Sequence, residues 1–208
     1  MEVVENLRLL IQDLENSEVA TCCVLTLHKF LTDNERTFEF NSKFTEDEYS
    51  ELIDLTMSLL EMEEFNLDLK LKVLKLLRLL SRDKPLVLRI KDLNRCINCY
   101  AKCINRAFLS ALNRDCAIEV LKCLSNWIFH SKAIRDCLLN KTSTQSFVTV
   151  LGKSKDVLDD FLQYQLRIIF LMSAHEHEFR VSMIEFDALK SLDSILQTVL
   201  SGFEKENE

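Results

Sequence analysis

Three cysteines, Cys96, Cys99 and Cys103, have the spacing in this sequence that most resembles a metal site. Zinc and iron–sulfur ligands occur at similar intervals, but they lie on loops or knuckles. Here the three positions form an i, i+3, i+7 stripe of a helical segment, and a fourth ligand would have to come from Cys116, Cys123 or a histidine. We therefore expect an apolar helix face and no bound metal.

Histidines and further cysteines do not form a catalytic pattern either. His175 and His177 are two residues apart, so they point to different sides of a helix, and the second histidine of an HExxH zinc site is missing. We expect them to flank a turn between helices. Cys22 and Cys23 share one predicted helix with His28, but on differing faces. The sequence therefore predicts a protein that is not an enzyme.

Composition favours a helical protein without a nucleotide site. The 208 residues include only two glycines and one proline, too few for the turns of a sandwich or barrel. Gly152 and Gly202 are far apart, whereas a phosphate-binding loop needs clustered glycines. We expect an all-α fold, no P-loop or Rossmann turn, and no cofactor.

The cellular compartment follows from the first residues and the cysteines. The N-terminus opens acidic and amphipathic, and no apolar run approaches the roughly 18 residues of a membrane span. The eight cysteines are then expected to remain reduced, mostly as small buried hydrophobic residues. We expect a cytoplasmic protein without a transmembrane segment.

Charge is unevenly distributed. Residues 32–64 carry eleven acids and two bases, whereas residues 70–106 carry eleven bases and two acids. Within the basic segment, Lys75, Arg78 and Arg82 line one stripe of a helix and could receive an acidic or carboxylate-bearing partner. The alternative is an ordinary solvated helix face. Nucleic acid is not expected as a partner, because the pI is near 5.3 and aromatic residues are not interleaved with the bases.

Apolar residues recur with a helical period along nearly the whole chain. Start signals include a capping box at Thr45 and Glu48, and Pro85 in a first helical turn. Residues 33–44 lack the period and are expected to form a loop whose phenylalanines dock on the core, and residues 203–208 a polar tail. The predicted helices span 2–15, 18–32, 46–63, 67–81, 85–94, 96–110, 114–130, 132–140, 143–152, 156–173, 176–185 and 187–201.

Three segments repeat at a long period. Residues 73–77 (VLKLL) match 120–124 (VLKCL) at an offset of 47, and residues 121–124 match 166–169 at an offset of 45. This is the period of armadillo and HEAT units, which must stack to bury their apolar faces. The pattern predicts one domain over residues 1–208, an armadillo/HEAT-like right-handed α-solenoid of about four repeats. A compact helical bundle is the alternative.

Four strings of residues, taken in order, resemble landmarks of the synembryn family. They are TFEF (37–40), RLLSRD (78–83), LKCLSN (121–126) and LRIIFLMSA (166–174). The resemblance covers roughly residues 35–201, and its specificity comes from the ordered set rather than from any single string.

That resemblance implies a protein that binds heterotrimeric G-protein α subunits in their GDP-bound or nucleotide-free form. Members act as folding chaperones and as non-receptor guanine-nucleotide exchange factors, in the cytoplasm and at the cell cortex. Their concave groove accepts the C-terminal helix of the α subunit, which loosens the nucleotide pocket. Exchange is then a population shift driven by differential binding.

Matching the strings residue by residue implies a partner-binding set of Arg78, Arg82, Asn126, Arg167 and Phe170, and Lys75 joins it through the charged stripe. A helix that ends in a free carboxylate carries a negative dipole end, which paired arginines can bind. Reversing Arg78 and Arg82 to Glu is expected to abolish binding and to leave folding nearly unchanged.

Family members have a longer repeat array, so this chain is expected to supply only the N-terminal part of the groove, as a fragment, a short isoform or a divergent relative. We expect a monomer. The competing hypothesis is a helical-repeat scaffold that binds another acidic peptide or helix without exchange activity.

Overall fold

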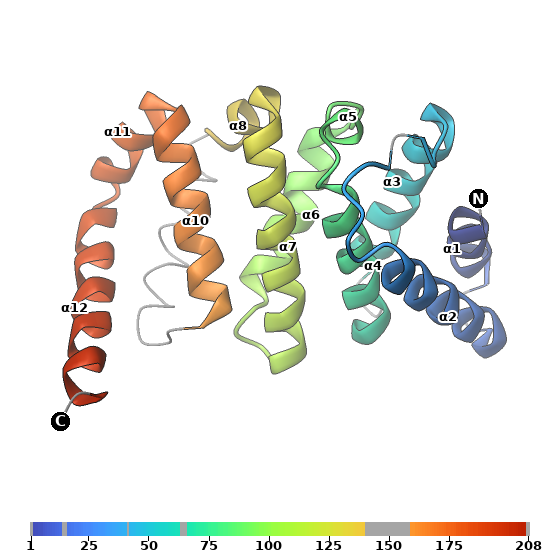
Figure 1. Ribbon diagram of the computed structural model, residues 1–208, viewed down its shortest axis with the longest axis horizontal. Coiled ribbons are helices and arrows are strands. Elements are labelled where there is room, and N and C mark those ends of the chain that lie inside the picture. The colour runs from blue at the N-terminus through green and yellow to red at the C-terminus, as the bar shows by residue number, and fades with distance from the viewer. Residues whose placement is uncertain (1, 14–15, 41, 63–65, 140–158, 207–208) are drawn as a thin grey trace. The chain divides into compact units, whose positions relative to one another are not determined.

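The computed structural model describes residues 2–13, 16–40, 42–62, 66–139 and 159–206, and all regular structure in these ranges is α-helical (Figure 1). This confirms the all-α prediction. The helices are α1 (Glu2–Gln12), α2 (Ser17–Asp33), α3 (Glu46–Glu61), α4 (Leu67–Leu80), α5 (Lys84–Val87), α6 (Leu93–Asn105), α7 (Ala111–His130), α8 (Lys132–Leu138), α10 (Asp160–His175), α11 (His177–Glu185) and α12 (Ala188–Glu206). No helix among the described residues is both long and apolar enough to cross a membrane.

The chain divides into two compact units, Met1–Ser131 (unit 1) and Lys132–Glu208 (unit 2). In unit 1, α1 packs on α3 and α3 on α6, while α2 packs on α4 and α4 on α7 (Figure 1). The two rows are joined by contacts of α1 with α2, α3 with α4, and α6 with α7. Unit 1 is therefore two layers of helices arranged in successive pairs.

Helices α4 and α7 form the centre of unit 1. Eight of the fourteen residues of α4 are buried, and ten of the twenty residues of α7. Tyr100 of α6 stacks near Trp127 of α7, with ring centroids 5.0 Å apart, and both side chains are fully buried. Although α4 is enclosed over most of its circumference, Lys72, Lys75 and Arg78 form a strip that remains partly open.

Capping side chains define where the helices begin. The predicted capping box is present: the Thr45 hydroxyl accepts the Glu48 amide, and the Glu48 carboxylate accepts the Thr45 amide. Further N-caps that accept backbone amides are Asn16 for α2, Asn66 for α4, Asp92 for α6, Ser110 for α7 and Asp159 for α10.

The segment predicted as one helix over 85–94 is divided between the end of α5, at Val87, and the first residues of α6, from Leu93. Asp92 instead accepts the backbone amide of Arg95 and caps α6. An N-cap residue has non-helical backbone angles, so the first helix must end before it. At the other end of the chain, α12 continues past Gly202 to Glu206, beyond the predicted end. The predicted helix 143–152 lies outside the described residues.

The irregular loop between α2 and α3 packs as expected for two of its three phenylalanines. Phe40 and Phe44 are buried, and both rings lie within 6.3 Å of the Phe30 ring. Phe38 is 64% exposed, so its predicted docking on the core is wrong. Its ring instead lies against a cation on the surface.

In unit 2, α11 packs on both α10 and α12. Phe161 and Met172 of α10 are buried, as are Phe179 and Met183 of α11. An ion pair of 2.7 Å between Arg135 of α8 and Glu176 joins α8 to the turn before α11.

Candidate partner-binding site

Arg78 is held against α7 by a buried acid. Its Nε lies 2.7 Å from Oε2 of Glu119, whose side chain is only 8% exposed, and the contact is an ion pair rather than an aligned hydrogen bond. The other oxygen of Glu119 accepts from Lys122 Nζ at 2.9 Å. Arg78 of α4 and Lys122 of α7 therefore share the carboxylate of Glu119.

Asn126 joins the end of α4 to α7. Its amide nitrogen donates to the Ser81 hydroxyl at 2.8 Å, and that hydroxyl donates to the backbone carbonyl of Arg78 at 2.6 Å. Ser81 is the C-cap of α4, so the Asn126 side chain fixes the point where α4 stops. The structure thus links Asn126 through Ser81 to the backbone of Arg78.

Arg82 is positioned by the loop between α2 and α3. Its Nη1 donates to the backbone carbonyl of Glu35 at 2.6 Å, and its guanidinium lies 5.3 Å from the Phe38 ring centre. Burial lowers the pKa of Arg82, and the nearby charge of Arg78 lowers it further. This cation–π contact explains why Phe38 stays on the surface.

Asp83 fixes the same loop, although no signal in the sequence marks it beyond its place two residues before Pro85. The side chain is buried, and its Oδ2 accepts the backbone amide of Phe40 in a short hydrogen bond. The buried Phe40 amide has no strand or helix to pair with, so a carboxylate from the α4–α5 turn satisfies it. Asp83 therefore supports the placement of Phe38 over Arg82.

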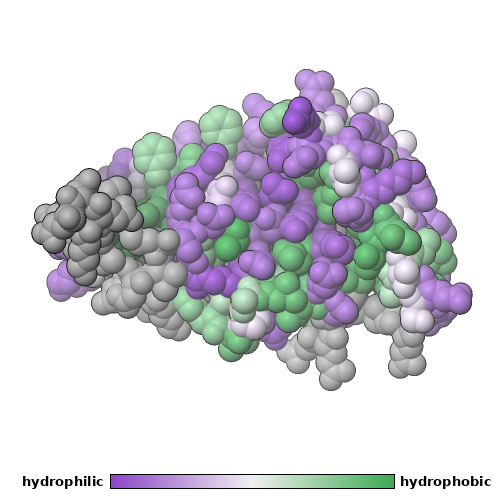
Figure 2. Space-filling model, turned by 60° about the horizontal axis from the view of Figure 1, so that its bottom comes forward, coloured by the Kyte–Doolittle hydropathy of each residue, from purple (hydrophilic) through white to green (hydrophobic). Residues whose placement is uncertain are grey.

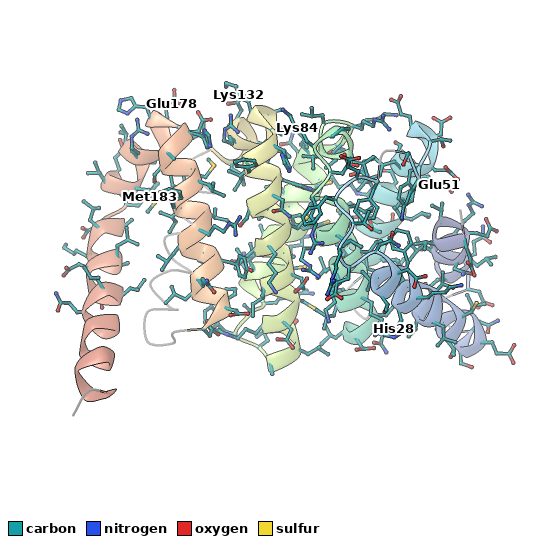
Figure 3. All side chains as sticks on the ribbon, viewed as in Figure 1. His28, Glu51, Lys84, Lys132, Glu178 and Met183 are labelled. Carbon is teal, nitrogen blue, oxygen red and sulfur yellow. The ribbon has the colours of Figure 1, made fainter. Side chains whose placement is uncertain are left out.

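His130 is the last residue of α7, and it lies close enough to Lys84, the first residue of α5 (labelled in Figure 3), for the charge of Lys84 to affect its pKa. Burial lowers the pKa of His130, a hydrogen bond with the Arg82 backbone opposes this, and Lys84 contributes a smaller lowering. The exposed Phe129 ring lies 5.3 Å from the His130 ring. Aromatic and basic groups thus gather at the C-terminal ends of α4 and α7.

The remaining predicted residues are on open surfaces. Lys75 is half-buried on the open strip of α4, one turn before Arg78. In unit 2, Arg167 and Phe170 lie three residues apart on α10, both exposed, and Phe170 is 70% exposed. A phenylalanine this exposed is free to contact a partner.

The cysteine stripe lies on the buried face of α6, as expected. Cys96, Cys99 and Cys103 are all buried, and burial raises the pKa of each thiol, to about 12 for Cys96 and Cys99. Within the described ranges no group of three or more His, Cys, Asp or Glu side chains is arranged to hold a metal ion. Because thiolates are the reactive and metal-binding form, these neutral thiols act as core residues.

A family model described as guanine nucleotide exchange factor synembryn matches residues 73–208. The chain belongs to this family. A search of the curated proteins finds no match. The matched range starts inside α4 and includes Lys75, Arg78, Arg82 and Asn126 in unit 1 and Arg167 with Phe170 in unit 2.

Membership in the synembryn family confirms the resemblance and the class of activity drawn from the sequence. A guanine nucleotide exchange factor acts by binding another protein and changing its affinity for nucleotide, not by bond chemistry of its own.

Proposed function

We propose that this chain binds heterotrimeric G-protein α subunits, in their GDP-bound or nucleotide-free form, as a folding chaperone and non-receptor exchange factor. The observation that carries the proposal is the family match over residues 73–208, which contains every residue of the proposed surface. The partner segment is the C-terminal helix of the α subunit. Lys75, Arg78, Arg82 and Asn126 of unit 1 contact it, and Arg167 and Phe170 of unit 2 provide a separate contact with the α subunit.

The charge of the α4–α7 surface supports this choice of partner. The C-terminal end of a helix has a partial negative charge and, at a chain terminus, a free carboxylate as well. Arg78 lies in an ion pair with the carboxylate of Glu119, and Arg82, close enough for its pKa to be affected by Arg78, adds a second cation at this end of α4. Hydrophilic side chains gather in the middle of the face that Figure 2 shows, with hydrophobic ones toward its lower edge.

Exchange follows from capture of that helix. A partner that binds the helix only when it is detached from its own domain stabilises the open form of the α subunit. GDP then leaves, and GTP replaces it. The same binding stabilises a nascent α subunit before it acquires nucleotide, because any ligand specific for one state raises the population of that state.

The wider architecture belongs to the same proposal. The paired helices of unit 1 and the sequence offsets of 45 to 47 residues favour one armadillo/HEAT-like right-handed α-solenoid of about four repeats over residues 1–208. The chain acts as a monomer in the cytoplasm and at the cell cortex, where G-protein α subunits are found.

Binding to GDP-loaded α subunits tests the proposal, with an α subunit that lacks its C-terminal helix as the control. GDP release is followed in the same samples with a fluorescent nucleotide. We expect binding that requires the C-terminal helix and is accompanied by faster release. Failure to bind any class of α subunit would overturn the proposal and favour a helical-repeat scaffold for another acidic partner.

Charge-reversal variants locate the site without disturbing the fold. Lys75→Glu and Arg167→Glu change open positions that have no ion-pair partner among the described residues. Each should weaken binding about ten-fold, as expected for loss of one charged hydrogen bond. Lys29→Glu, an equal change at an exposed position of α2, is the matched control and should bind like the parent. Equal binding by all three variants would show that the site lies elsewhere.

A further inference from the structure

An exposed phenylalanine of the loop between α2 and α3 lies on a residue of the proposed partner surface. Phe38 is 64% exposed, and the centre of its ring lies 5.3 Å from the Arg82 guanidinium. Single apolar side chains on a protein surface are common and need no explanation. Phe38 differs from them because contacts on both sides of it in the chain determine where its ring lies.

The contacts before Phe38 belong to a turn at the end of α2. Asn34 is buried, and its backbone carbonyl accepts the amide of Thr37 at 2.9 Å. The carbonyl of Glu35, inside this turn, accepts from Nη1 of Arg82 at 2.6 Å. The turn therefore holds the loop backbone against one edge of the guanidinium.

The contacts after Phe38 lead back to the same place. The side chain of Phe40 is buried, and its backbone amide donates to the buried carboxylate of Asp83. Asp83 directly follows Arg82 between α4 and α5, and the loop passes beside this connection (Figure 1). Because the loop is attached there on both sides of Phe38, little conformational freedom remains to be lost when the ring rests on Arg82.

The Arg82 guanidinium keeps the capacity to bind a partner. A guanidinium carries five N–H bonds, and within the described ranges only one of those of Arg82 has an acceptor, the Glu35 carbonyl. The charges of Glu35 and Glu119 also act on Arg82, but burial and the charge of Arg78 outweigh them and lower its pKa. A carboxylate from a partner would add the compensation that these two acids do not complete.

We propose that Phe38 positions Arg82 for its partner: the ring and the Glu35 carbonyl together hold the guanidinium in the orientation that binds a carboxylate of the α subunit. The identity of the partner rests on the proposed function. The inference extends the site to a loop outside residues 73–208, the range that the family model matches. An arginine side chain that is already ordered loses less rotamer entropy on binding, so its contact with the partner becomes stronger.

Substitutions of Phe38 that separate an aromatic face from apolar bulk test the inference. Phe38→Leu retains an apolar side chain without an aromatic face, whereas Phe38→Tyr retains the face. Binding of the whole chain to a GDP-loaded α subunit is measured by calorimetry. We expect Phe38→Leu to weaken binding about three-fold, as for loss of an exposed cation–π contact, and Phe38→Tyr to bind like the parent. If Phe38→Leu binds as well as the parent or better, the inference is overturned and the proposed function stands.

Two further variants separate positioning from direct contact. Phe129→Leu is the matched control, because Phe129 is also 64% exposed but its ring lies against His130. It should bind like the parent, and a loss equal to that of Phe38→Leu would contradict a specific role of Phe38. In an Arg82→Ala background, Phe38→Leu should have no further effect, since no guanidinium remains to be positioned. A three-fold loss that persists there would mean that Phe38 contacts the partner itself, and would overturn the positioning role.

The order of the Arg82 side chain tests the inference without a partner. Nitrogen relaxation of Nε gives an order parameter, which is about 0.85 for a rigid N–H bond and below about 0.6 for a flexible one. We expect a high value in the parent and in Phe38→Tyr, and in Phe38→Leu a fall toward the value of Arg36, an exposed arginine of the same loop. Equal values in the parent and Phe38→Leu would overturn the inference. Failure of the parent to bind any α subunit would instead overturn the proposed function, while the order parameter would still decide whether Phe38 positions Arg82.

Discussion

At its C-terminal end α4 carries Arg78, which is paired with a buried acid of α7, whereas at its N-terminal end it carries Lys70, which is buried without an acid partner in the described residues. Arg82, just beyond the C-terminal end, is held by a carbonyl and an aromatic ring. The two ends share one strongly basic segment of sequence, residues 70–106. Their difference shows that the net charge of a segment does not tell which of its cations are compensated within the fold, whereas the contacts of each side chain do.

Among variants at the two ends of α4, Arg78→Glu should have the largest effect on the free energy of unfolding. The variant places a second carboxylate beside Glu119, whose side chain is 8% exposed, and removes its partner. Breaking a buried ion pair in this way should cost about 3 kcal/mol of unfolding free energy, measured by urea denaturation. From the sequence alone we expected that reversing Arg78 would leave folding nearly unchanged. The ion pair with Glu119 changes that expectation, because the variant now disturbs a buried contact.

Two variants serve as references for that measurement. Lys75→Glu, one turn away on the open strip of α4, should change stability by less than about 0.5 kcal/mol. The exchanged pair Arg78→Glu with Glu119→Arg should recover part of the loss. If Arg78→Glu costs no more than Lys75→Glu, the contact with Glu119 does not stabilise the C-terminal end of α4.

Asp83→Ala should have the next largest effect, about 2 kcal/mol of unfolding free energy. The substitution leaves the buried backbone amide of Phe40 without an acceptor. Because the loop between α2 and α3 then loses its attachment, trypsin should cleave faster at Arg36 and Lys43. Asp83→Asn retains an oxygen acceptor and should behave between the alanine variant and the parent. An unchanged cleavage rate in Asp83→Ala would show that the loop is held by Phe40 and Phe44 packing alone.

Much of this arrangement could be predicted from local sequence signals. The capping box at Thr45 and Glu48, the buried cysteine stripe of α6 and the matched segments of α4 and α7 all depend on residues close together in the chain. Helix starts and apolar faces are local properties, so periodicity and capping rules identify them.

The partners of the site residues could not be predicted in the same way. Glu119 meets Arg78 across 41 positions, and Asp83 meets Phe40 across 43. Nothing in the local pattern marks Glu119 as buried or Asp83 as the acceptor of a loop amide. Such contacts depend on how helices pack, and packing determines whether a cation in the sequence is exposed, paired or left without compensation.

The smallest expected effect is a pH dependence of stability that comes from His130, at the C-terminal end of α7. Burial lowers the pKa of His130, a hydrogen bond with the Arg82 backbone and the charge of Asp83 oppose this, and Lys84 adds to the lowering. The folded state therefore binds a proton less readily than the unfolded chain, whose histidine has a pKa near 6.5. Stability is fully present above that value and is lost as the pH falls toward the lower pKa of the folded state.

Urea unfolding of the parent and of His130→Asn between pH 8 and pH 5 measures this contribution. The parent should lose more stability than the variant over the acidic half of that range, and the two should run parallel above pH 7. Lys84→Ala removes a cation that disfavours the protonated ring and should reduce the loss in the parent background. If the parent instead gains stability relative to His130→Asn on acidification, the pKa of His130 is raised in the folded state. Asp83 and the Arg82 backbone would then outweigh burial and Lys84.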